Sequence, residues 1–146
     1  MPRKPPPRVP AHRVADPFSL SKPELKKVFE RAGGEAGLEN ILLDFYGRMS
    51  RDLLIGFFFI GKDVEAIARK QKDFLLRAFG ARPSYSGKPP AEAHESLAPI
   101  LSGHFDRRLQ LLEETLRDHG LAAEDIRSWV GFENAFRGQI VAEPGR

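Results

Sequence analysis

Apolar residues at helical spacing constrain the fold of this chain more than any other feature. The sequence places Leu38, Ile41, Leu42, Phe45 and Met49 at positions i, i+3, i+4, i+7 and i+11. That spacing brings these side chains to one face of an α-helix. No stretch of the sequence alternates apolar and polar residues at period two, as a half-buried strand would. We therefore predict an all-α fold.

Capping residues, glycines and prolines delimit the other predicted helices. These helices are expected over residues 21–33, 63–79, 91–97, 102–119 and 122–141. Asp63 and Ser102 are the expected N-caps of two of them. The run between Arg51 and Gly61 is too short and too apolar for a surface helix. It predicts a tight turn that inserts phenylalanines into the core.

Composition limits the chemistry that this chain can carry. A chain of 146 residues is long enough for one domain with a single core. It contains no cysteine, which excludes disulfides, thiolate catalysis and cysteine-ligated metal sites and fits a reducing cytoplasm. The longest apolar run, residues 53–60, is far shorter than the ~18 residues that span a membrane. No signal peptide is visible near Met1, so we predict a cytoplasmic location.

The N-terminal segment differs from the rest of the chain in charge and proline content. Residues 1–15 hold four basic residues, no acidic residue and five of the twelve prolines. Such a segment can bury almost nothing, so residues 1–20 are predicted to be a disordered basic extension and 21–146 the folded domain. Basic charge without interleaved aromatic residues is more typical of a solvated leader than of a nucleic-acid or membrane arm.

An ordered series of residues along the domain resembles one protein family. The series comprises Gly33-Gly34, Phe45-Tyr46, Phe58-Phe59, Lys70-Gln71, Tyr85, Ala93-His94 and His104-Phe105. In this order and spacing, roughly residues 25–142 resemble the truncated haemoglobins, and the pair Ile67 and Gln71 resembles their first subgroup. The resemblance implies a truncated globin-like, two-over-two helical sandwich that binds one haem b.

The resemblance implies that His94 is the ligand of the haem iron. Globins hold the iron through one neutral imidazole, and His94 stands at the matching position. Taken alone, a histidine in a short helical piece bracketed by prolines is more often a structural or surface residue. His104, in the first turn of the helix expected after Ser102, is the competing candidate.

Tyr46 and Gln71 are implied to be the functional donors to the gas ligand. Both polar groups are expected beside apolar faces, so each needs a hydrogen-bond partner. The residues alone leave open that the two side chains simply bond to each other. In the family both point at the gas, and dioxygen, which gains negative charge on binding, is favoured over carbon monoxide by such donors. Ile67 is apolar where many globins keep a distal histidine.

The other implied pocket residues are apolar walls and groups that reach the haem propionates. They are Phe58 and Phe59 against the haem, Ile67, Phe74 and Leu75 on the distal side or a ligand tunnel, and Lys70 and Tyr85 near the propionates. Ordinary core filling explains the phenylalanines equally well, and a lysine at an exposed helix edge is usually just solvated.

Arg108 departs from the family pattern. It lies eight residues after Ile100, where the family usually has an apolar residue or a tryptophan that faces the haem. The sequence leaves two alternatives open, because the side chain could enter the pocket or turn to solvent.

The resemblance implies a globin that binds dioxygen and oxidises nitric oxide to nitrate, with carbon monoxide as a further ligand. The alternative is oxygen binding for transport, storage or sensing without turnover. A third possibility is a haem-free helical interaction protein. The chain has no flavin or nicotinamide fingerprint, so a separate reductase would supply electrons. We expect a monomer or a weak homodimer.

Overall fold

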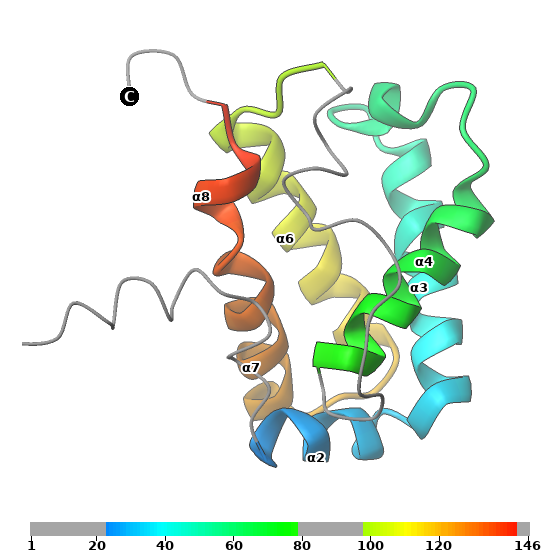
Figure 1. The fold of residues 1–146 in the computed structure, drawn as a ribbon, viewed down its shortest axis with the longest axis vertical. Coiled ribbons are helices and arrows are strands. Elements are labelled where there is room, and N and C mark those ends of the chain that lie inside the picture. Colours follow the sequence, from blue (N-terminus) through cyan, green and yellow to red (C-terminus); the bar gives the residue numbers. More distant parts are fainter. Residues whose placement is uncertain (1–22, 79–97, 143–146) are drawn as a thin grey trace, which may run out of the picture.

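The computed structural model describes residues 23–78 and 98–142. These residues form helices and connecting turns and contain no strand, which confirms the all-α prediction (Figure 1). The elements are α2 (Pro23–Arg31), α3 (Gly34–Arg51), the 3-10 helix η2 (Gly56–Phe59), α4 (Val64–Ala78), α6 (Ser102–Asp118), α7 (Ala123–Asn134) and α8 (Arg137–Ile140). The predicted N-terminal extension, the loop over 80–90 and the helix over 91–97 lie outside the described residues.

Two helix pairs enclose the core. Helix α3 packs against α4 and α6, α6 packs against α7, and α2 contacts both α3 and α7. Figure 1 shows the α3–α4 pair on one side and the α6–α7 pair on the other. This is the two-over-two arrangement that the resemblance to truncated haemoglobins implies. None of the helices in the described part of the chain is both long and apolar enough to cross a membrane.

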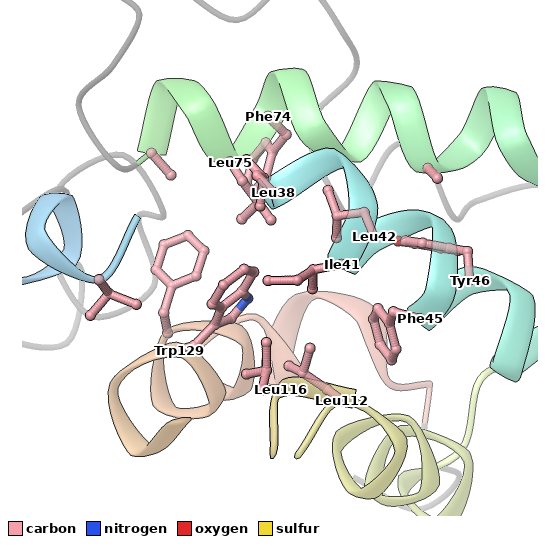
Figure 2. Close-up of a cluster of buried hydrophobic side chains, with 14 of the residues drawn as sticks. Leu38, Ile41, Leu42, Phe45, Tyr46, Phe74, Leu75, Leu112, Leu116 and Trp129 are labelled. Carbon is pink, nitrogen blue, oxygen red and sulfur yellow. The ribbon is translucent and has the colours of Figure 1, made fainter. Parts of the chain in front are cut away.

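The apolar face of α3 forms the centre of the core, as its spacing predicts. Leu38, Ile41, Leu42, Phe45 and Met49 are each at most 1% exposed. Figure 2 shows that Trp129 of α7 and Leu112 and Leu116 of α6 approach this face from the other helix pair. Burying each such side chain contributes about 1.5–3 kcal/mol. The face that packs the core also directs Tyr46, next to Phe45, toward the interior.

Glycines make the sharp turn between α2 and α3. Gly33 and Gly34 adopt positive φ angles of 107° and 67°, which glycine reaches without steric cost. Gly37 is needed for a different reason, because a Cβ atom there would lie 2.0 Å from the carbonyl oxygen of Ala32. The closeness of the two backbones sets the angle at which α3, and with it Tyr46, enters the core.

Gly37→Ala should destabilise the protein by about 1–3 kcal/mol or more, because backbone atoms would have to move to admit the methyl group. Gly131→Ala is the matched control, since nothing lies within 4 Å of a Cβ at that helical position. The control should be neutral or stabilising by up to about 1 kcal/mol. Denaturant unfolding of the haem-loaded protein measures both changes, and equal stabilities would contradict the packing argument.

The helix caps confirm one sequence prediction and correct another. Asp63 caps α4 as predicted, because its Oδ1 accepts a hydrogen bond of 3.1 Å from the backbone N–H of Ala66. Ser102 is the first residue of α6 rather than its cap, and its hydroxyl accepts a hydrogen bond from Arg137 at 3.1 Å. The cap contact at this end comes instead from His104, whose Nδ1 accepts the Leu101 backbone N–H at 3.0 Å.

The predicted last helix is two helices. Helix α7 ends at Asn134, where the N–H of Ala135 is shared between the carbonyl oxygens of Gly131 and Phe132. The bend lets Phe136 turn inward, with its ring edge-on to Phe132 at 5.4 Å. Sequence periodicity could not show the break, because apolar residues continue at helical spacing on both sides of it.

The apolar stretch before α4 forms the tight turn that was predicted, but its aromatic residues do not all enter the core. Ile55 is buried, and Phe58 and Phe59 are half-buried. Phe57 is 48% exposed, so the prediction of core phenylalanines is wrong for this residue. The turn is too short to direct three consecutive side chains to the same side.

Candidate functional site

Tyr46 is a buried residue whose hydroxyl-bearing ring lies among other aromatic rings. Its side chain is on α3 and is 7% exposed. The Phe45 ring lies 5.3 Å away, and the Phe59 ring of η2 meets the Tyr46 ring edge-on at 6.1 Å. Burial raises the pKa of the phenol above its ordinary value. The hydroxyl therefore keeps its proton at physiological pH and can donate a hydrogen bond.

Arg108 enters the interior, which decides between the two alternatives left open by the sequence. Its guanidinium lies beside the Tyr46 hydroxyl, and its carbon Cζ lies 5.1 Å from the centroid of the Phe45 ring. Burial disfavours the charge on the guanidinium, but the carboxylate of Glu133 and the hydroxyl of Tyr46 together outweigh burial and raise the pKa of Arg108. Arg108 thus carries a permanent positive charge next to Tyr46.

Glu133 anchors Arg108 and was missed by the sequence reasoning. Its carboxylate accepts a hydrogen bond of 2.7 Å from Arg108 Nη1 and one of 3.3 Å from Trp129 Nε1. A signal was present, because Glu133 lies four residues after Trp129 and hence on the same helical face. An acidic residue on a buried face requires a partner, and the sequence alone did not show which basic residue would reach it.

Gln71 is a half-buried residue of α4, and its side chain does not hydrogen-bond to Tyr46. Within the described residues, no hydrogen bond joins the Gln71 amide to Tyr46 or to another group. Mutual pairing of the two side chains, the simplest structural explanation of both, is therefore not what the structure shows. The amide remains able to donate to a bound molecule.

The remaining predicted pocket residues differ in burial. Leu75 is fully buried, and Phe74 is buried with its ring edge-on to Phe136 at 5.5 Å, so both contribute to the core (Figure 2). Ile67 is half-buried on α4, and Lys70 is exposed. His94 and Tyr85 lie outside the described residues.

The described residues fit the distal side of a haem pocket. The half-buried side chains of Phe58, Phe59 and Ile67 are of the kind that pack against an apolar porphyrin. Tyr46 is buried, and Gln71 makes no hydrogen bond within the described ranges; both are donors of the kind that meet a partly anionic gas. Lys70 is exposed on α4 and carries the positive charge that would pair with a propionate.

His104, the competing candidate for the iron ligand, is engaged elsewhere. Its ring packs edge-on against Phe57 at 5.6 Å and Phe58 at 5.1 Å. Because Nδ1 accepts the Leu101 N–H, a neutral His104 carries its proton on Nε2. Neither ring nitrogen then offers a free lone pair to a metal, and the arrangement is that of a capping residue.

Comparisons with known proteins agree with this architecture. Residues 27–141 match the sequence profile of the bacterial-like globin family. A group 1 truncated haemoglobin of Tetrahymena thermophila is 32% identical over 68% of this chain and 81% of its own length. A group 1 truncated haemoglobin of Synechocystis is 33% identical over 70% of this chain and 84% of its own.

Solved structures show the same fold. The truncated haemoglobin of Tetrahymena pyriformis in its Fe(III) form superposes with a TM-score of 0.73 and 26% identity, over 79% of this chain and 97% of that protein. The 2/2 haemoglobin of Synechococcus, solved with covalently attached haem, gives 0.70 and 25% identity, over 78% and 97%. The chain therefore belongs to the bacterial-like globin family, as a truncated haemoglobin of the first group.

Proposed function

We propose that this globin uses the dioxygen it binds to oxidise nitric oxide to nitrate. Haem iron is the cofactor and dioxygen a ligand, as membership of the globin family implies. The overall reaction, NO + O2 + e− → NO3−, consumes one electron from outside the protein in each turnover. Haem supplies the reversible binding and reduction of dioxygen, which no amino-acid side chain can perform.

The residues that would hold the haem come from several elements. We assign the proximal ligand to His94, on the strength of the family pattern and of the engagement of His104 in a helix cap. Phe58, Phe59 and Ile67 would contact the porphyrin. Lys70 and Tyr85 are the candidates for the propionates.

The single observation that carries the proposal is the buried, protonated hydroxyl of Tyr46, whose ring lies against the rings of Phe45 and Phe59. A preorganised donor in a water-poor site stabilises a ligand that gains negative charge, and Gln71 would supply a second donor. Dioxygen held in this way stays long enough to meet nitric oxide. Carbon monoxide gains little charge and would benefit less.

We propose that the electron comes from a separate protein, since no flavin or nicotinamide fingerprint is found in this sequence. We therefore propose a one-electron reductase as the partner. The reducing cytoplasm would supply it, and a sequence without cysteine suits that compartment.

Mixing the oxygen-loaded protein with nitric oxide in a stopped-flow instrument tests this function. One nitrate should form for each haem, much faster than dioxygen leaves the protein spontaneously. The carbon monoxide-loaded protein is the control and should form none. Nitrate formation limited by the dissociation of dioxygen would overturn the proposal and favour transport, storage or sensing.

A further inference from the structure

A buried ion pair connects Tyr46 on α3 to helices α6 and α7. Arg108 and Glu133 are joined at 2.7 Å, and their side chains are only 20% and 5% exposed. The second carboxylate oxygen of Glu133 accepts the Trp129 indole N–H. Trp129 is itself fully buried, so the series of contacts from Tyr46 through Arg108 and Glu133 ends at a side chain that is packed in the core (Figure 2).

Stability alone is a weak explanation for this pair. Removing two charges from water is costly, and apolar residues of similar volume often serve a core as well or better. Phe45 presents its ring to the guanidinium at 5.1 Å, and the carboxylate of Glu133 contacts the buried indole of Trp129. The polar groups next to this charge are Glu133 and Tyr46. Because Glu133 is its counter-ion, Tyr46 is the group on which the charge can act.

The chemistry of the guanidinium determines how Tyr46 can bond. Arginine has five N–H donors and no acceptor, so between Arg108 and Tyr46 the hydroxyl oxygen must be the acceptor. The hydroxyl hydrogen of Tyr46 is then not used in this contact. Among the described residues, the Tyr46 hydroxyl donates no hydrogen bond to Gln71 or to any other acceptor.

We propose that Arg108, held by Glu133, is a positioning residue that fixes the Tyr46 hydroxyl as an acceptor on one side and so leaves its O–H for a ligand of the haem. This proposal rests on the donor role given to Tyr46 in the proposed function. The nearby positive charge also makes the phenol a stronger donor toward a partly anionic ligand. The pair therefore increases the preference of the site for dioxygen over carbon monoxide.

The test removes both charges at once, so that neither is left buried without a partner. Arg108→Met with Glu133→Gln does this and keeps an amide oxygen for Trp129 to donate to. With Tyr46 present, dioxygen should dissociate about tenfold faster, the effect of losing roughly one hydrogen bond. In the Tyr46→Phe background the same pair of substitutions should change the rate less than about twofold.

Two spectroscopic readouts separate positioning from a merely structural role. The infrared C–O stretch of the carbon monoxide complex should rise when Arg108 and Glu133 are replaced, and only while Tyr46 is present. The chain has two tyrosines, so in a Tyr85→Phe background a 13Cζ-tyrosine label reports Tyr46 alone. Its NMR signal in the diamagnetic carbon monoxide complex should shift on loss of Arg108.

Matched variants complete the design. Arg31→Met with Asp125→Asn removes another ion pair of α7, joined at 2.6 Å, and should leave dioxygen dissociation unchanged. Arg108→Lys keeps the charge and should retain a rate within about threefold of the wild type. It also keeps the test possible if the double variant does not hold haem.

The outcomes distinguish the two proposals. If Tyr46→Phe changes neither the dioxygen dissociation rate nor the C–O stretch, the donor role in the proposed function fails. If Tyr46→Phe has its effect but loss of Arg108 and Glu133 has none, or acts equally without Tyr46, the positioning role alone is overturned.

Discussion

His94→Ala should abolish stoichiometric haem binding, because the iron would lose the imidazole that we assign as its protein ligand. The haem would keep its apolar contacts and its propionate partners but lose the bond to the iron, with a loss of affinity of roughly tenfold or more. The ratio of Soret absorbance to protein, followed by haem titration, measures the change. Free imidazole added to the variant should restore part of the binding, as expected for a lost ligand rather than a lost fold.

His104→Ala is the matched control for this prediction. It removes the acceptor for the Leu101 N–H and the ring that packs on Phe57 and Phe58. We expect a loss of stability of about 0.5–2 kcal/mol, as for other cap residues, with haem still bound at one per chain. Retention of haem by His94→Ala and its loss in His104→Ala would reverse the assignment.

Tyr46→Phe and Gln71→Leu should each accelerate the dissociation of dioxygen. Losing one donor in a water-poor pocket should cost about 1–3 kcal/mol, or roughly five- to 150-fold in affinity. The change should appear in the dissociation rate, because the hydrogen bonds form after the ligand has entered. Stopped-flow measurements on the two single variants and the double variant give the individual effects and their coupling.

Carbon monoxide is the internal control for that experiment. It gains little charge on binding, so its dissociation should change much less in the same variants. Equal acceleration of both gases would indicate a loosened pocket rather than lost donors. Unchanged dioxygen rates in all three variants would show that Tyr46 and Gln71 are structural and would remove the distal site proposed for this chain.

Local patterns in the sequence determined the helices and much of the core. The spacing of apolar residues in α3 predicted a face that is at most 1% exposed, and Asp63 caps α4 where its position indicated. These features depend on residues within a few positions of one another, which a linear pattern contains. The resemblance to truncated haemoglobins added the prediction that Tyr46 and Gln71 donate to the gas ligand. The burial of Tyr46 agrees with this prediction.

Tertiary structure alone decided where the polar groups of the interior go. Arg108 lies 25 positions from Glu133 in the chain, and no local pattern joins them across two helices. Periodicity shows which face of a helix is turned to the core. The partner of a buried charge depends instead on which helices pack together. The buried pair that holds Tyr46 could therefore be located only once α3, α6 and α7 had been placed.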